Sequence, residues 1–174
     1  SLIEPFAADG FNKAHAASYG RVAYQTAYMK ANFPVAYMTA IMTNESGDVE
    51  KIAEIVSECK RMKITVLPPD VNMSEGGFSI VRKQSEEISN ESPEQNLEKS
   101  NATDGSDEEI RFGLYTIKNL GVDIADAIIE ERNRGGKYTS FENFIRRVTH
   151  KNLNKKSLEA LTMCGALDAF APRG

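Results

Sequence analysis

The stretch LYTIKNLGVDIADAII, residues 114–129, carries apolar side chains on both sides of a single glycine, Gly121. This arrangement predicts an apolar helix, a tight turn at the glycine, and a second helix. Ala127 and Ile128 would lie on the face of the second helix that turns back toward the first. The stretch therefore predicts two short helices joined by a hairpin turn, a helix-hairpin-helix.

A tight glycine turn at the start of a helix exposes backbone N–H groups, which together with the helix dipole can bind one phosphate. Such contacts position a protein on a DNA duplex but read no bases. Gly121 and Val122 are the candidate turn residues. Four cations are candidate phosphate contacts that would make binding salt-dependent: Lys118, Arg132, Arg134 and Lys137. The alternative is a plain pair of helices in which the glycine only makes the turn, and both interpretations stay open.

Asp123 stands two residues after Gly121, at a position where many such hairpins have a second glycine. A carboxylate there would either repel a phosphate or cap the second helix. Residues 153–168, which include MCGALD, are similar to a second, degenerate copy of the hairpin. The lysines of NKK at 154–156 are more simply explained as a cap and a solvated helix face.

The N-terminal part of the chain predicts three helices. Residues 13–43 favour helix throughout, with a break at Pro34, where a proline suits the first position of a new helix. Residues 48–62 show apolar side chains at helical spacing, and Ser46 or Asp48 would be the N-cap. Residues 139–148 predict another amphipathic helix, with Thr139 or Ser140 as its N-cap. The chain after it again predicts a helix that is followed by a glycine, Gly165.

Between these helical parts, short apolar runs predict strands. ITVLPPDVN begins as a short strand, and residues 78–81 and 109–117 would form a pair. The polar, acidic run between that pair has too few apolar side chains to offset the entropy of ordering. We therefore expect an acidic, disordered insertion over 82–109, and a solvated linker is its simplest role.

The charge of the chain is unevenly distributed. The formal net charge of the 174 residues is −4. Residues 81–110 carry three basic and nine acidic side chains, whereas residues 111–174 carry eleven basic and seven acidic ones. The C-terminal third could therefore face a polyanion such as nucleic acid.

Several classes of protein are excluded by what the sequence lacks. Two cysteines far apart, two histidines and no CxxC indicate neither a disulfide framework nor a zinc site. The sequence has no Walker loop, no GxGxxG and no run of about 18 apolar residues that could cross a membrane. No secretory signal is visible, and the first residue is Ser1. We expect a cytoplasmic fragment of a longer protein that has no membrane partner and is not a catalyst by itself.

The N-terminal stretch GFNKAHAASYGRVAYQTAYMK, residues 10–30, places Asn12, Lys13 and His15 at the start of a helix of small and aromatic residues. Lys13 and His15 could contact a phosphate, since lysine is a compact cation and histidine can donate to a phosphoryl oxygen. The alternatives are a solvated lysine and a capping or packed imidazole. The small residues predict that the helix itself packs tightly.

Five blocks of the sequence together resemble a known family. They are GFNKAHAASYGRVAYQTAYMKANFP, ECKRMKITVLPPDVNMSEGGFSI, IRFGLYTIKNLG, AIIEERNRGGKYTSFENFIRR and NKKSLEALTMCGALDAF. In this order they are similar to the late fingers region and the tandem helix-hairpin-helix of the alpha subunit of bacterial DNA polymerase III, a C-family replicative polymerase. The resemblance covers nearly the whole chain except 82–109.

The resemblance implies a DNA-directed DNA polymerase, a nucleotidyltransferase that extends DNA from deoxynucleoside triphosphates. Its two Mg²⁺ ions are held by palm aspartates upstream of this chain, so the isolated piece should bind no metal and be inactive. By position, Asn12, Lys13 and His15 would neighbour the incoming triphosphate, although Ala14 stands where the family usually has Ser. Contact with duplex DNA is implied at Gly121. Contact with other replisome subunits such as the sliding clamp is implied through regions outside this chain, at a cytoplasmic, nucleoid-associated location.

The resulting expectation is a mostly α fold with a small β-hairpin, a helical fingers segment plus tandem helix-hairpin-helix. Residues 1–67 would finish the fingers, 68–114 would be a connector with the β-hairpin and the insertion 82–109, and 115–174 would be the DNA-binding module. Two alternatives remain. The chain could be a non-catalytic helix-hairpin-helix module that binds duplex DNA, or a protein-interaction scaffold whose acidic loop recruits partners.

Overall fold

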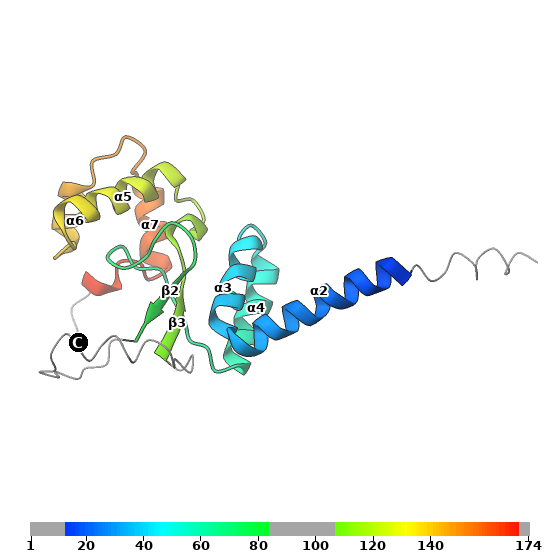
Figure 1. The fold of residues 1–174 in the computed structure, drawn as a ribbon. Coiled ribbons are helices and arrows are strands. Elements are labelled where there is room, and N and C mark those ends of the chain that lie inside the picture. Colours follow the sequence, from blue (N-terminus) through cyan, green and yellow to red (C-terminus); the bar gives the residue numbers. More distant parts are fainter. Residues whose placement is uncertain (1–12, 84–106, 171–174) are drawn as a thin grey trace, which may run out of the picture.

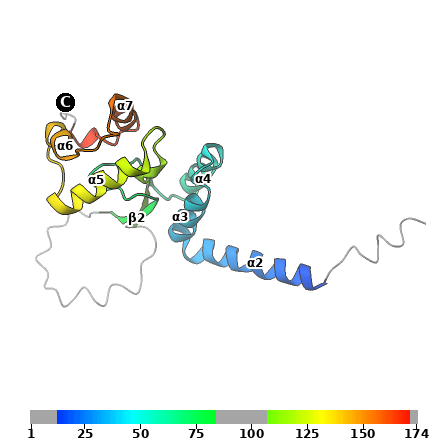
Figure 2. The ribbon, with the colours of Figure 1, turned by 90° about the horizontal axis from the view of Figure 1, so that it is seen from above.

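The structure of the protein, a computed structural model, describes residues 13–83 and 107–170, with side chains placed from residue 16 onward. Three N-terminal helices lie on one side of a small sheet, and three further helices lie on the other (Figures 1 and 2). The predicted mostly α fold with a small β-hairpin is confirmed. Among the helices of these two ranges, none is both long enough and apolar enough to cross a bilayer.

The N-terminal helices are α2 (Lys13–Asn32), α3 (Pro34–Asn44) and α4 (Val49–Arg61). The predicted break at Pro34 is confirmed, and this proline takes the first turn of α3, where a missing N–H costs no hydrogen bond. Of the two predicted caps, Asp48 is the one used. Its side chain accepts hydrogen bonds from the backbone N–H groups of Glu50 and Lys51, each at 3.1 Å.

The sheet has the strand order β1-β3-β2, with β1 (Val66–Leu67), β2 (Ser79–Arg82) and β3 (Glu108–Arg111). β2 pairs antiparallel with β3, and β1 pairs parallel with it on the other side. A backbone hydrogen bond from Lys83 to Asp107 continues the antiparallel ladder. Both ends of the predicted insertion 82–109 therefore belong to the sheet, and residues 84–106 lie outside the described part of the chain.

The strand predicted over 109–117 ends at Arg111, so the prediction is wrong for residues 112–117. After it the backbone of Gly113 packs directly on the backbone of Gly76 and Gly77, where any Cβ would overlap their carbonyl oxygens. The chain then enters a single 3-10 turn, η4 (Leu114–Thr116). Close approach of two backbones, possible only at a residue without a side chain, thus redirects the chain out of the sheet.

The C-terminal module comprises η4, α5 (Val122–Gly135), α6 (Phe141–Arg147), α7 (Lys155–Met163) and η5 (Asp168–Phe170). Ser140, one of the two predicted caps of α6, accepts a hydrogen bond from the backbone N–H of Asn143 at 3.0 Å. Asn154 and Ser157 form a reciprocal capping box at the start of α7. The element before the Gly121 turn is one 3-10 turn rather than the predicted regular helix, so the hairpin has a short first arm.

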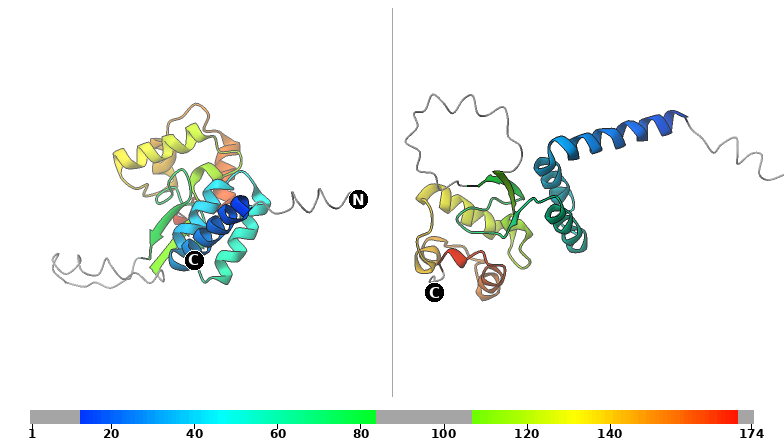
Figure 3. Two further views of the ribbon diagram at one scale, coloured as in Figure 1. Left: turned by 45° about the vertical axis from the view of Figure 1, so that its right-hand side comes forward. Right: turned by 90° about the horizontal axis from the view of Figure 1, so that it is seen from below.

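Two separate apolar clusters hold the described elements together. The C-terminal cluster joins η4, α5, α6 and α7, and its largest fully buried side chain is Phe144. The N-terminal cluster joins α3 and α4 to the sheet through Val35, Met42, Cys59 and Ile110. The two clusters lie on opposite sides of the sheet, as the views in Figure 3 also show.

Helix α2 belongs to neither cluster and extends away from the rest of the molecule (Figures 1 and 3). Its aromatic side chains Tyr19, Tyr24 and Tyr28 are 65%, 70% and 51% exposed. An ion pair between Lys30 and Glu58, at 2.7 Å, fixes its C-terminal end to α4. The expected tight packing of this helix is therefore not found among the described residues.

Candidate nucleic-acid interface

The turn before α5 lies at the protein surface. Gly121 is the N-cap residue of α5, with an extended backbone (φ −68°, ψ 149°), and its carbonyl accepts hydrogen bonds from the N–H groups of Ile124 and Ala125. Gly121 and Lys118 are exposed, and Val122 is 55% exposed. The turn is thus exposed to solvent, but the carboxylate of Asp123 accepts hydrogen bonds from the backbone N–H groups of Ile124 and of Asp123 itself at the start of α5.

Asp123 lies in the first turn of α5, beside Gly121. Its Oδ2 accepts a hydrogen bond from Nδ2 of Asn152 at 2.5 Å and lies 3.8 Å from Nε2 of His150. The hydrogen bond from Asn152 and those from backbone N–H groups, with the nearby imidazole of His150, lower the pKa of Asp123. This carboxylate is therefore ionised at neutral pH and links α5 to the loop between α6 and α7.

The predicted cations differ in how they are placed. Lys118 and Lys137 are exposed and take part in no ion pair within the described residues. Arg134 is also exposed, but its guanidinium is hydrogen-bonded to the carboxylate of Glu131 one helical turn earlier. The two lysines are free to meet a phosphate, whereas Arg134 would first have to leave its partner.

Arg132 lies in the core rather than on the surface, with only 8% of its side chain exposed. Its Nη1 donates to the carbonyl oxygen of Ser74 at 2.6 Å, and its Nη2 donates to Oε1 of Glu75 at 3.0 Å. The side chain follows Ala125 and Ile128 on the buried face of α5. Arg132 therefore ties α5 to the loop that precedes β2, and the prediction that its guanidinium contacts DNA is wrong because this group is buried and bonded within the protein.

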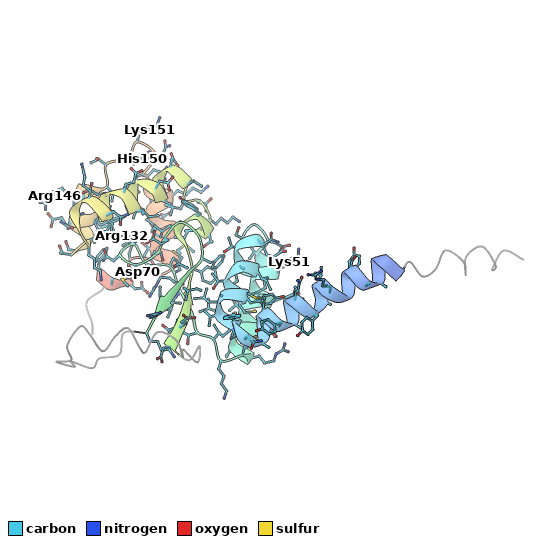
Figure 4. The ribbon with its side chains drawn as sticks, viewed as in Figure 1. Lys51, Asp70, Arg132, Arg146, His150 and Lys151 are labelled. Atoms are coloured by element: carbon cyan, nitrogen blue, oxygen red, sulfur yellow. The ribbon has the colours of Figure 1, made fainter. Side chains whose placement is uncertain are left out.

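Two exposed cations, Arg146 and Lys151, were not singled out from the sequence as DNA contacts. Figure 4 shows that they and the half-buried His150 lie on the side of the C-terminal module that faces away from the sheet. Arg146 and Lys151 have no ion-pair partner in the described ranges, and Lys156 at the start of α7 has none either. The local excess of basic residues was a usable signal, but sequence alone did not show which cations are free.

Arg147 follows Arg146 in the chain but, unlike it, is bound to partners within the protein. Its Nε donates to Oε1 of Glu131 at 3.1 Å, its Nη2 donates to two backbone carbonyls, and its guanidinium lies 4.7 Å from the ring centroid of Tyr138. Hydrogen bonds from Arg134 and Arg147 lower the pKa of Glu131. The cluster of Glu131, Arg134 and Arg147 joins α5 to α6, and it holds Arg134 of α5 and Arg147 of α6 in contacts within the protein.

The predicted second copy of the hairpin, 153–168, consists of α7, a turn and the single 3-10 turn η5. Gly165 takes a left-handed conformation (φ 80°) that closes the C-terminal end of α7. The backbone N–H groups of Gly165 and Ala166 donate hydrogen bonds to the carbonyl oxygens of Thr162 and Leu161, respectively. No regular helix follows this turn within the described residues, so it presents no second helix start comparable to that of α5.

The candidate triphosphate neighbours lie at the edge of the described part. Asn12 lies outside it, and Lys13 and His15 fall in the first turn of α2, where only the backbone is described. The first turn of α2 contains no acidic residue. Their predicted role stays a prediction. In residues 16–83 and 107–170 no three His, Cys, Asp or Glu side chains are grouped so that they could hold a metal ion.

A family described as a helix-hairpin-helix motif matches residues 63–173. The chain is 41% identical over 172 residues to the DNA polymerase III subunit alpha of Thermus aquaticus, covering 99% of this chain and 12% of that protein. The corresponding proteins of Deinococcus radiodurans and Borreliella burgdorferi are 40% and 42% identical over 99% and 97% of this chain, which covers 11% and 13% of their lengths.

Proposed function

Because the chain belongs to the helix-hairpin-helix family and aligns over nearly its whole length with a segment of DNA polymerase III alpha subunits, we propose that it works as part of a replicative DNA polymerase. The reaction of the longer protein would be DNA-templated nucleotidyl transfer. In this proposal the C-terminal module holds the backbone of the duplex, and the start of α2 neighbours the incoming deoxynucleoside triphosphate. The location would be the bacterial cytoplasm, at the nucleoid.

The proposed contact with duplex DNA rests chiefly on the open start of α5. Gly121 and Val122 expose the turn to solvent, and Lys118 stands beside it without a partner among the described residues. Because the carboxylate of Asp123 already accepts hydrogen bonds from backbone N–H groups at this turn, the exposed lysines are the main donors to phosphate oxygens, which every base sequence presents alike. The contact should therefore be independent of base sequence and sensitive to salt, as a polymerase that copies any template needs.

The salt dependence of duplex binding tests this function. Each phosphate neutralised by a cation contributes about −0.9 to the slope of log K against log salt. We expect Lys118→Ala and Lys137→Ala each to weaken binding of a mixed-sequence duplex, measured by fluorescence anisotropy, and to reduce the slope by about one. Lys60→Ala, on the solvent-exposed face of α4, is the matched control and should change neither the affinity nor the salt slope. The proposed function would be contradicted if the affinity for the duplex did not change with salt concentration, or if neither lysine substitution changed it.

For the nucleotide contact, the argument comes from charge at the start of α2. Lys13 is the first residue of the helix, and no acidic residue in its first turn opposes the positive end of the helix dipole. In the full-length polymerase, Lys13→Ala should raise the KM for deoxynucleoside triphosphate or lower kcat. Unchanged kinetics would remove Asn12, Lys13 and His15 as triphosphate neighbours. The metal ions that such a reaction needs would be held by residues outside this chain.

The exposed face of α2 favours a protein contact as well. Tyr24 and Tyr28 are largely exposed and lie side by side, with ring centroids 6.4 Å apart, and exposed apolar side chains grouped in this way mark contact surfaces. In our proposal other parts of the longer polymerase cover this helix. Amide exchange tests this, because the amides of α2 should exchange fast in the 174-residue chain and slowly in the full polymerase. The scaffold alternative instead predicts fast exchange in both until a partner is added.

A further inference from the structure

An open apolar groove lies between the end of α7, the turn before α5 and the two prolines that follow β1. Its volume is about 540 Å³, within the range of roughly 300–1,000 Å³ that is typical of ligand sites. The apolar part of its lining includes Pro68, Pro69, Phe112, Ile117, Ala160 and Met163. Met163 is 89% exposed, more than any other large apolar side chain of the described residues. Its flexible thioether side chain is therefore available to cover an apolar ligand.

The walls of this groove are held in place by hydrogen bonds within the protein. Nη1 of Arg111 donates to the carbonyl oxygen of Pro68 at 3.1 Å, beside a proline pair whose φ angles are fixed by their rings. In the turn before α5, the N–H of Leu120 donates to the carbonyl oxygen of Ile117 at 3.1 Å, and Asn119 takes a left-handed conformation (φ 68°). A groove whose walls are ordered in advance loses less conformational entropy when it binds a ligand.

The charge at this groove is positive. Lys118 lines it, and no carboxylate of the described residues does. Lys156 lies one helical turn before Ala160 on the same face of α7, and it is exposed without an ion-pair partner in the ranges 16–83 and 107–170. The groove thus combines an apolar lining with cations at its rim. Such a surface is complementary to a ligand that is apolar at its centre and acidic at its ends.

We propose that this groove is a docking site for an acidic peptide segment of a partner protein. One large apolar side chain of that segment fills the groove beside Met163, and carboxylates next to it pair with Lys118 and Lys156. The backbone of a nucleic acid presents phosphates but no apolar side chain, so the apolar lining favours a peptide. The inference goes beyond the proposed function. Because Lys118 belongs to both surfaces, an acidic peptide in the groove would compete with duplex DNA.

A fluorescein-labelled hexapeptide with leucine and phenylalanine at its centre and two acidic residues on each side tests the groove. We expect saturable binding to the 174-residue chain by fluorescence anisotropy, and none of a matched peptide that has lysines in place of the acidic residues. Met163→Ala should weaken binding roughly three- to tenfold, because it removes most of the apolar area that the peptide covers there. Lys118→Ala and Lys156→Ala should each weaken it about two- to fivefold, as loss of an exposed ion pair does. Val49→Ala, at a side chain of α4 that is 81% exposed, is the matched control and should leave the affinity unchanged.

Duplex binding and unfolding midpoints are measured on the same variants, so that a folding defect is recognised. The inference predicts that Met163→Ala weakens binding of the peptide but not of the duplex. It is overturned if the peptide does not bind, or if Met163→Ala leaves the affinity for the peptide unchanged, since a site for polyanions alone would need only the lysines. In either case, duplex binding that Lys118→Ala weakens would leave the proposed function standing. Peptide binding without duplex binding would support the inference while the proposed function fails.

Two other occupants of the groove are distinguished in the same way. If the 174-residue chain forms dimers that Met163→Ala dissociates, measured by analytical ultracentrifugation, a second copy fills the groove and the inference is overturned. If the peptide binds the 174-residue chain but not the full-length polymerase, another part of the polymerase covers the groove, and the inference is likewise overturned. Saturable binding to the full-length polymerase that Met163→Ala weakens there too would support it.

Discussion

Replacement of Arg132 by methionine separates a structural role from a DNA-contact role. Methionine keeps an unbranched apolar stem of similar length, so the main loss is the guanidinium. The hydrogen bond from this cation to the buried carbonyl of Ser74 contributes about 1.5–3 kcal/mol. The ion pair with Glu75, whose side chain is 59% exposed, adds at most about 1 kcal/mol. Arg132→Met should therefore lower the free energy of unfolding by about 2–4 kcal/mol.

Urea denaturation followed by circular dichroism measures this loss, and the salt slope of duplex binding is measured on the same variant below its unfolding midpoint. Arg134→Met is the matched control, because its side chain is 80% exposed and should change stability by less than about 0.5 kcal/mol. The slope for Arg132→Met should equal that of the unchanged protein. A loss of stability below about 1 kcal/mol together with a slope lower by about one would place Arg132 on the DNA and refute its structural role.

Three further outcomes follow from local contacts. Asn154→Ala removes the capping box of α7 and should cost about 1 kcal/mol in urea unfolding, whereas no change would mean that the box contributes nothing. Phe144→Ala empties the centre of the C-terminal cluster and should cost about 3–5 kcal/mol by the same measurement, and a cost near zero would contradict the cluster. The pKa of Glu131 is lowered below its ordinary value of 4.5, so its contribution is present above that pH and is lost as pH falls through the lowered value. Glu131→Gln should therefore be less stable than the unchanged protein at pH 7, with the difference shrinking toward pH 3, and a difference that grows toward acid pH would contradict the assignment.

Features that depend on a few neighbouring residues could be predicted from the sequence. The break at Pro34 follows from the missing N–H of proline, and the caps Asp48 and Ser140 act on N–H groups within three residues. The turn at Gly121 belongs to the same class, because the start of α5 is set by its own backbone. Such signals carry their physical cause within one helical turn, so no knowledge of the tertiary structure is needed.

Features that depend on distant parts of the chain could not be predicted from the sequence. The strand predicted over 109–117 stops early because Gly113 meets the backbone of Gly76, which no local pattern encodes. The sequence predicts a surface cation at Arg132, because its partner Ser74 lies 58 residues earlier and no local pattern shows that contact. A usable hint was present, since Arg132 falls on the same helix face as Ile128, and a cation on an apolar stripe often marks a buried partner.

The candidate site shows the same division. Sequence reasoning identified the open glycine turn and left two roles for Asp123, as a repulsive charge or as a cap. The structure adds a third, because the carboxylate joins Asn152 in a loop 29 residues later. Small and aromatic residues of α2 correctly indicate a helix, but the tight packing that they predict is not found in the described part of the chain.

The most direct test of the central claim is a map of the surface that meets DNA. Amide chemical shifts of the 174-residue chain are recorded while a mixed-sequence duplex is added at low salt. The account predicts that shifted amides cluster in residues 117–122 before α5, while those of α3 and α4 on the other side of the sheet stay unchanged. Shifts confined to α3 and α4, or an unshifted Gly121 turn in a chain that binds the duplex, would contradict it.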